Sequence, residues 1–208
     1  MAKAYLIGGT PRCGKTSIAL AALKVHPMFA TSTDSIRYTL RDVLTKENVP
    51  DLFAAHEKFT EESIVRLCSS GKSSEIVEWQ NKESRVVWKS VQRCIEGFIA
   101  EDLDILVEGV AILPEFLSQL TCEYSAVFVG NTDPSHVQHM LEYARSGRYD
   151  WMSAFNDETI RQFGQFTSVF SKYLQTESEK HGYRFVDMAQ GDYEATKIEV
   201  VKQLLGNF

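Results

Sequence analysis

The segment that most constrains the fold is residues 9–16, GTPRCGKT, which match the pattern G-x-x-x-x-G-K-[ST] at each fixed position. A short apolar run of strand type, 4–7, leads into it. A helical pattern of apolar residues, 15–25, follows it and stops at His26-Pro27. Strand, glycine-containing loop and helix in this order are typical of the phosphate-binding unit of parallel α/β proteins. The sequence therefore predicts a P-loop fold.

The residue types of this loop suit phosphate binding. Glycines let the backbone curl so that successive N–H groups face one anion, and the following helix adds about half a positive charge at its N-terminus. We expect Lys15 to reach the β- and γ-phosphates of ATP and the Thr16 hydroxyl to bind Mg²⁺. Pro11 has no N–H, so it is part of the loop without being a donor. The residues expected to bind the nucleotide are Gly9, Thr10, Pro11, Arg12, Cys13, Gly14, Lys15, Thr16 and Ser17.

Strand patterns and helical patterns alternate along the rest of the chain. Strand patterns lie at 28–32, 103–107, 124–129 and 183–186, and helical patterns at 35–44, 114–120 and 193–205, with several helices in 51–101 and a helix starting at Asp133-Pro134. This alternation predicts an α/β fold with a doubly wound parallel sheet. We expect one domain over 1–208, similar to nucleoside-monophosphate kinases, with a helical insertion at about 45–100 and a lid at about 143–158.

Two carboxylates follow predicted strands, where the carboxyl ends of a parallel sheet gather catalytic groups. Asp34 follows the second strand and is expected to accept the proton of a substrate hydroxyl, although it also suits a helix N-cap. Glu108 ends the strand at 103–107. It is expected to bind Mg²⁺ directly or through water, or else to orient the substrate.

Arginines supply candidate anion-binding groups on either side of these carboxylates. Arg37, one helical turn beyond Asp34, is a candidate for binding an anionic group of the substrate, and Arg41 is a weaker one. Arg145 and Arg148 are candidates for the arginine of a mobile lid that stabilises the transferring charge, with Gly147 supplying flexibility. The alternative for each is an ordinary surface charge on a helix.

Composition excludes several other classes of function. The net charge of −6 argues against binding a nucleic-acid polymer. The four cysteines are scattered without a CxxC pair, and the five histidines have no metal-binding spacing, which disfavours zinc and disulfides. We find no signal-peptide pattern and no apolar run long enough for a membrane, so we expect a cytoplasmic protein, either a monomer or a homodimer.

Three stretches together resemble a known group, the small P-loop kinases related to 2-phosphoglycerate kinase, and more distantly zeta-toxin-like and chloramphenicol-phosphotransferase-like kinases. The stretches are 8–16 (GGTPRCGKT), 32–37 (STDSIR) and 107–110 (VEGV) followed by Leu113-Pro114. The resemblance implies ATP, Mg²⁺ and a hydroxyl acceptor, with Lys15, Asp34 and Glu108 in the roles given above. The family has a histidine after its Glu-Gly-Val stretch, where this chain has Ala111, so the resemblance does not identify the acceptor.

The sequence thus favours an ATP-dependent phosphotransferase that acts on a hydroxyl or phosphate of a small-molecule metabolite. A nucleotide-dependent NTPase or regulatory protein without an acceptor is the alternative, and a protein that binds nucleotide without turnover is a third. A GTPase is disfavoured because the nearest string to its base-reading motif, GNTD at 130–133, lacks the lysine.

Overall fold

A computed structural model describes residues 1–147 and 150–206, and within them five parallel strands form one sheet in the order β2-β3-β1-β4-β5. The strands are β1 (Ala4–Gly9), β2 (Phe29–Ser32), β3 (Ile105–Gly109), β4 (Tyr124–Gly130) and β5 (Phe185–Asp187). The central strand β1 pairs Ile7 with Glu108 of β3 and with Val127 of β4. This register brings the end of β1, where the phosphate-binding loop begins, beside the end of β3.

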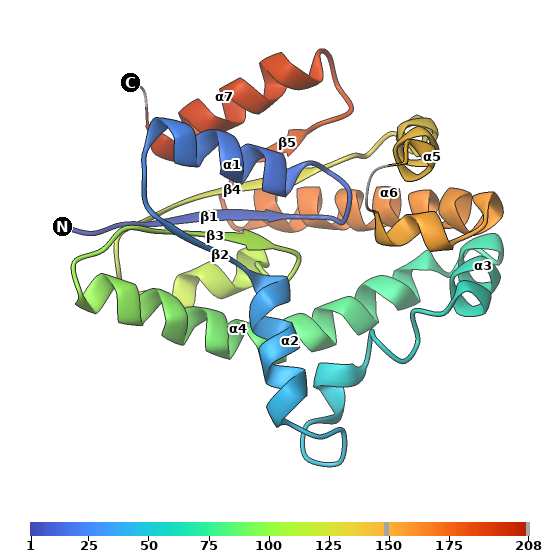
Figure 1. Ribbon diagram of the computed structural model, residues 1–208, viewed down its shortest axis with the longest axis horizontal. Helices are drawn as coiled ribbons and strands as arrows, with labels where there is room; N and C mark the ends of the chain where they lie inside the picture. Colours follow the sequence, from blue (N-terminus) through green and yellow to red (C-terminus); the bar gives the residue numbers. More distant parts are fainter. Residues whose placement is uncertain (148–149, 207–208) are drawn as a thin grey trace.

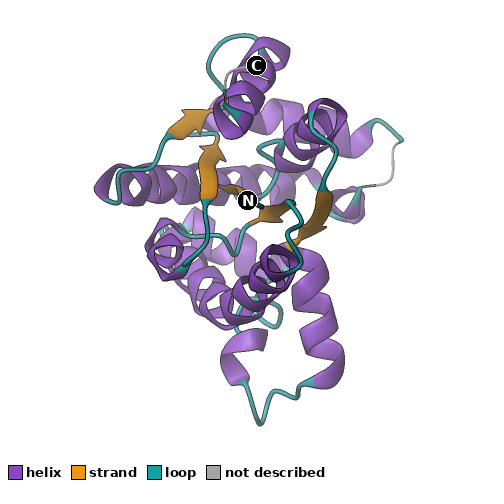
Figure 2. Cartoon of the chain, turned by 90° about the vertical axis from the view of Figure 1, so that its left-hand side faces the viewer, coloured by secondary structure: helices purple, strands orange, loops and turns teal. Residues whose placement is uncertain are grey.

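Helices cover both faces of the sheet (Figures 1 and 2). On one face α1 (Lys15–Val25) packs against α7 (Tyr193–Leu205), and on the other α4 (Ser73–Ala100) packs against α6 (Asp157–Lys180). The other α-helices of the described residues are α2 (Thr33–Val43), α3 (Glu61–Ser69) and α5 (Val137–Arg145). Short 3₁₀ helices are η1 (Pro50–Phe53), η2 (Pro114–Gln119), η3 (Pro134–His136) and η4 (Trp151–Ala154). The predicted doubly wound α/β fold is confirmed.

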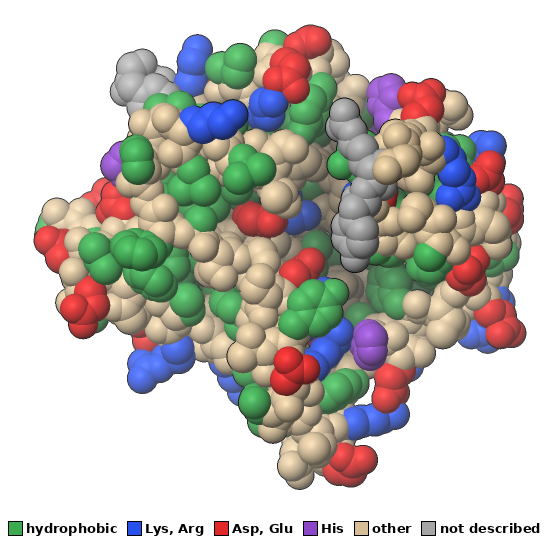
Figure 3. All heavy atoms as spheres, viewed as in Figure 1, with side chains coloured by type: hydrophobic (Ala, Val, Ile, Leu, Met, Phe, Trp, Pro, Cys, Tyr) green, Lys and Arg blue, Asp and Glu red, His purple; other side chains and the backbone are tan. Residues whose placement is uncertain are grey.

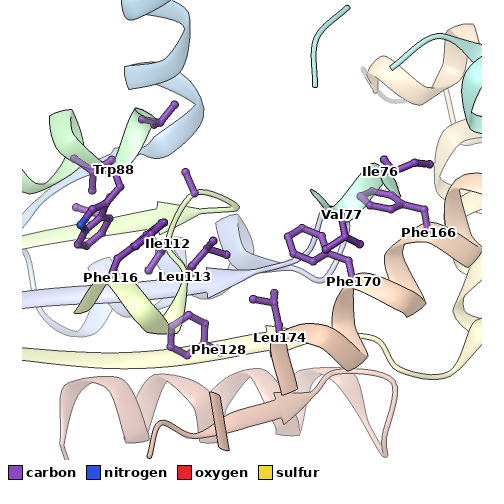
Figure 4. Close-up of a cluster of buried hydrophobic side chains, with 14 of the residues drawn as sticks. Ile76, Val77, Trp88, Ile112, Leu113, Phe116, Phe128, Phe166, Phe170 and Leu174 are labelled. Atoms are coloured by element: carbon purple, nitrogen blue, oxygen red, sulfur yellow. The ribbon is translucent and has the colours of Figure 1, made fainter. Parts of the chain in front are cut away.

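Alternate residues of the strands supply the two halves of the core. Leu6 faces the α4 and α6 side and Ile7 the α1 and α7 side, because successive side chains of a strand point to opposite faces. On the α4 side Trp88 is stacked on Phe116 with ring centroids 5.4 Å apart, and Figure 4 shows these rings among apolar side chains from α4, η2, β4 and α6. This packed layer holds α4 and α6 rigidly beneath the sheet.

The segment between β2 and β3 is helical, as predicted, and it contains η1, α3 and the long α4. The prediction missed α6, a helix of 24 residues with Asn156 as N-cap. The segment predicted as a helix at 114–120 is a 3₁₀ helix, with Pro114 at its start. The boundaries of the insertion and of the lid stay predictions, and part of the predicted lid, 148–149, lies outside the described residues.

In the part of the chain that the structure describes, none of the helices combines the length and the apolar character needed to cross a membrane.

Candidate active site

A cavity of about 1170 Å³ opens where β1 and β3 end, at the carboxyl edge of the sheet. The face drawn in Figure 3 is hollowed beside α2, with basic, acidic and histidine side chains around the hollow. Lys15 of α1, Asp34 and Arg37 of α2, and Glu108 of β3 all line it. Ligands of open α/β sheets bind at this edge, so the cavity is the candidate active site.

The phosphate-binding loop forms one wall of this cavity and is internally hydrogen-bonded. Lys15 is buried, and its Nζ donates to the carbonyl oxygen of Thr10 at 2.6 Å. Gly14 has a φ of 89°, a left-handed conformation that glycine adopts without strain, and it connects the loop to α1. Gly9 and Thr10 support the loop from behind: a Cβ on Gly9 would lie 2.4 Å from the Val129 carbonyl oxygen, and Thr10 is fully buried. Among the described residues, the loop residues that line the cavity are Pro11, Arg12, Cys13, Gly14, Lys15, Thr16 and Ser17.

Thr16 and Glu108 meet across the cavity floor, where the Thr16 hydroxyl donates to Glu108 Oε1 at 3.0 Å. The contact depends on the turn after β3. Gly109 has a φ of 153°, and a Cβ there would lie 1.9 Å from Thr33 Oγ1, so no larger residue fits without displacing α2. Thr33 in turn accepts a hydrogen bond from the Ala111 backbone N–H at 3.4 Å. The glycine therefore fixes Glu108 close to both α1 and the start of α2.

A charged network runs from Asp34 into the protein interior. Arg37 lies 3.2 Å from Asp34 through one terminal nitrogen and 3.2 Å from Glu83 Oε1 through the other. Arg41 lies 2.8 Å from the second oxygen of Glu83, whose side chain is fully buried in α4. Burial raises the pKa of Glu83, while the two guanidinium groups lower it. The pKa of Arg37 is raised, because Asp34 and Glu83 outweigh the opposing effect of burial.

A second buried ion pair joins the phosphate-binding loop to the segment before α6. Both terminal nitrogens of Arg12 donate to Asp150, at 3.3 and 2.8 Å, and the Asp150 side chain is fully buried. The same guanidinium lies over the ring of Tyr143, 4.7 Å from its centroid. Arg12 has a left-handed φ of 65°, and its side chain contacts Asp150 and Tyr143, which lie outside the loop. We therefore assign the Arg12 side chain a structural role, the ion pair with Asp150. Its backbone N–H stays a predicted donor to phosphate.

Of the two predicted lid arginines, the structure describes Arg145, which does not lie at the cavity. The guanidinium of Arg145 pairs with Asp157 at 2.7 Å and donates to the Ser153 and Phe155 carbonyl oxygens, and Arg145 is not among the described residues that line the cavity. Arg148 lies outside the described residues. A lid role for either arginine stays a prediction that would require Arg145 to leave these partners.

The nucleotide side of the cavity contains polar residues that the sequence reasoning did not single out as functional. Asn131, at the end of β4, donates to the Arg12 carbonyl oxygen at 3.5 Å. His136 is buried between the Asp133 carbonyl oxygen and the Thr167 hydroxyl, and burial lowers its pKa. The predicted N-cap at Asp133 is confirmed, since its side chain accepts from the Ser135 N–H.

Glu83 and Asp150 were also missed, although each is a buried acid. A charged residue within an apolar helical pattern, such as Glu83 between Gln80 and Val87, is a usable signal because buried carboxylates need cationic partners. Its partners are 42 and 46 residues away in sequence, so the pattern alone does not name them.

Within residues 1–147 and 150–206, no group of three or more His, Cys, Asp or Glu side chains is arranged to hold a metal ion. The Thr16 and Glu108 pair instead offers two oxygen ligands at the loop. That is the usual arrangement for Mg²⁺ bound together with phosphate groups, since the remaining ligands are phosphate oxygens and water.

Comparisons with known sequences find kinases among the relatives of the chain. No family model matches it. It is 25% identical over 202 residues to the 2-phosphoglycerate kinase of Methanothermobacter thermautotrophicus, covering 96% of this chain and 64% of the relative. It is 23% identical to that of Methanocaldococcus jannaschii (88% and 57%) and 25% identical to that of Thermococcus kodakarensis (88% and 60%). The chain thus spans about three fifths of the length of these curated relatives.

Solved structures confirm the fold. The shikimate kinase of Acinetobacter baumannii, in complex with shikimate, aligns with a TM-score of 0.51 at 14% identity, covering 99% of this chain and 93% of that one. The shikimate kinase of Bacteroides thetaiotaomicron aligns with a TM-score of 0.52 at 12% identity, covering 98% of each chain. In sequence and in fold, the chain is similar to small P-loop kinases, and archaeal 2-phosphoglycerate kinases are among its relatives.

Proposed function

We propose that this chain is a phosphotransferase that moves the γ-phosphoryl group of ATP, bound with Mg²⁺, to a hydroxyl of a small anionic metabolite. The observation that carries the proposal is the convergence of Lys15, Asp34, Glu108 and Arg37 on one cavity at the carboxyl edge of the sheet. A protein that binds nucleotide without an acceptor needs Lys15 and Glu108. It does not need a carboxylate and an arginine across the cavity from the loop, such as Asp34 and Arg37.

The residues present fit the expected magnesium ion. Thr16 and Glu108 are oxygen ligands of the kind that Mg²⁺ prefers, and their hydrogen bond of 3.0 Å shows that they approach one point. When bound, the ion neutralises negative charge on the phosphates. Lys15 would add a second positive charge from the loop side, because its ammonium group lies within the loop, where it contacts the Thr10 carbonyl oxygen and Cys13 Sγ.

The acceptor half is formed by α2. Asp34 is half-exposed toward the cavity and would take the proton of the acceptor hydroxyl as the oxygen attacks phosphorus. Arg37 and Arg41 line the same part of the cavity and would bind a carboxylate or phosphate group of the acceptor. The relatives named above make 2-phosphoglycerate the first acceptor to test. Ala111, at the place of the family's histidine, is a reason to test others.

The direct experiment is to incubate the chain with labelled ATP, Mg²⁺ and separate hydroxyl acceptors, including 2-phosphoglycerate, glycerate and shikimate, beside a reaction without acceptor. Transfer that depends on one acceptor supports the proposal. Hydrolysis at the same rate with and without acceptors would refute it in favour of an NTPase. Asp34→Asn should abolish most transfer while leaving ATP binding intact, and equal loss of both would remove Asp34 from the proton-accepting role.

A further inference from the structure

The most unusual charged group in the acceptor half is Glu83, a fully buried carboxylate in the middle of α4. A buried carboxylate is costly unless cations and hydrogen bonds compensate it. Glu83 has two such partners, one on each oxygen: Arg37 at 3.2 Å and Arg41 at 2.8 Å. Since both arginines come from α2, the carboxylate connects α2 to α4 behind the cavity.

The spacing along α2 explains why one carboxylate can bind both arginines. Asp34, Arg37 and Arg41 lie at positions i, i+3 and i+7, which share one face of a helix. The first is near the phosphate-binding loop and the last is near η1, where Arg41 Nε donates to the Leu52 carbonyl oxygen at 3.3 Å. Glu83 therefore contacts the middle and the inner end of a row of charges whose outer end is the proposed proton acceptor.

Arg37 is the link between the buried and the reacting carboxylates. One of its terminal nitrogens bonds Glu83 and the other lies 3.2 Å from Asp34. A guanidinium group is planar, so fixing one nitrogen also fixes the directions of the others. Its Nε is buried and has no hydrogen-bond partner within the described part of the chain. The polar contacts that orient Arg37 are therefore those with the two carboxylates, and its guanidinium group also lies over the ring of Tyr38, 5.1 Å from the centroid.

We propose that Glu83 is a positioning residue of the acceptor site: it holds Arg37 and Arg41 against the cavity and, through Arg37, sets the direction of Asp34. The inference rests on the proposed function, because it assigns Glu83 to the acceptor half of the phosphotransferase and not to the nucleotide half. Loss of the carboxylate releases both guanidinium groups from one fixed plane. Acceptor binding and the transfer step then weaken together, while the loop that binds ATP, on the opposite side of the cavity, keeps its geometry.

The test compares Glu83→Gln with the wild type and with Glu78→Gln. Glu78 is a matched control on the exposed face of the same helix, where it pairs with Lys82 at 3.2 Å. Kinetics use whichever of 2-phosphoglycerate, glycerate and shikimate the wild type phosphorylates. Glu83→Gln should raise the KM for the acceptor at least tenfold and lower kcat, with the KM for ATP changed less than twofold. Glu78→Gln should change none of the three.

A second readout does not need turnover, so it separates this inference from the proposed function. In nitrogen-15 spectra of the wild type, the guanidinium groups of Arg37 and Arg41 should rotate slowly and give separate, protected side-chain signals. Glu83→Gln should merge or broaden both sets. If that variant does not fold, Glu83→Asp serves instead, because it keeps the charge but cannot reach both guanidinium groups.

Two results would overturn the inference. One is a folded variant at Glu83 whose arginine signals are unchanged. The other is a parallel change of the KM values for ATP and acceptor by one factor, which would make Glu83 a general support of the fold. If the wild type hydrolyses ATP at the same rate with and without acceptors but the arginine signals respond as expected, the proposed function fails, while the contact by which Glu83 holds the two arginines of α2 is upheld.

Discussion

Removing the cation of the Arg12–Asp150 pair should destabilise the protein strongly. Arg12→Met keeps a long side chain and a Cβ at the left-handed φ of 65°. The backbone strain at this position is therefore the same in the wild type and the variant, and it does not contribute to the difference in their free energies of unfolding. What is lost is a bidentate partner of a fully buried carboxylate, at 2.8 and 3.3 Å, and a guanidinium stacked 4.7 Å from the Tyr143 ring.

The magnitude follows from burial. Breaking a buried ion pair by removing one partner costs about 3–5 kcal/mol. The lower end applies here, because Arg12 is one-fifth exposed and Asp150 still accepts the Met152 N–H at 3.1 Å. A loss of about 3 kcal/mol in the free energy of unfolding corresponds to a fall in Tm of about 6–12 °C for a chain of this size.

Urea unfolding followed by fluorescence, with thermal unfolding in parallel, measures this loss. Arg145→Met is the matched control, because its pair with Asp157 is largely exposed and should cost less than about 1 kcal/mol. In the double variant Arg12→Met/Asp150→Asn, part of the loss should be recovered, since no buried charge is left unpaired. Equal, small effects of Arg12→Met and Arg145→Met, with additive behaviour in the double variant, would refute the reasoning.

Three further changes test other parts of the structure. Lys15→Ala should lower phosphate transfer by at least about two orders of magnitude while the circular dichroism spectrum is unchanged, because the proposed function has Lys15 contact the phosphates and the structure shows it bonded to the loop's own Thr10 carbonyl oxygen. Transfer within tenfold of wild type would contradict this role. Gly109→Ala should destabilise the chain by about 2 kcal/mol or more in urea unfolding, since its Cβ would lie 1.9 Å from Thr33 Oγ1. The pKa of His136 is below its ordinary value of 6.5, so the unfolded chain binds the proton more readily and stability should fall as the pH drops below about 6.5. His136→Gln should flatten that dependence between pH 7.5 and 5.5, and an unchanged slope would show that other groups cause it.

The sequence predicted those elements whose residues interact locally. The loop at 9–16 identifies itself by its own spacing, α1 was predicted at its observed bounds by its apolar periodicity, and α7 begins after the N-cap Asp192. The helix α6 was missed because its inner face mixes polar and apolar side chains. Thr159, Thr167 and Ser171 are buried beside Phe163 and Phe170, so the apolar period is diluted. A search for the N-cap pattern at Asn156 would have found its start.

In the candidate site, too, the residues marked by a local pattern could be predicted, and those brought together by packing could not. Asp34, Arg37 and Glu108 could be proposed because a strand end is visible in the sequence. The pairs Arg37–Glu83 and Arg12–Asp150 join residues 46 and 138 positions apart, and they meet because α2 packs on α4 and because the segment before η4 packs on the phosphate-binding loop. These pairs matter for stability because their carboxylates are buried. Whether one acidic residue is buried depends on the packing of the whole fold, so the sequence pattern does not predict it.

The bond from Lys15 to the Thr10 carbonyl oxygen has a consequence for ligand choice. An arriving anion competes with an acceptor that the ammonium group already has, at 2.6 Å. A single inorganic phosphate gains little from that exchange. A polyphosphate chain that also occupies the loop amides and the helix N-terminus gains several interactions for the one it displaces. On the proposed function, we therefore expect the resting loop to discriminate by the length of the anion and to favour a triphosphate over inorganic phosphate.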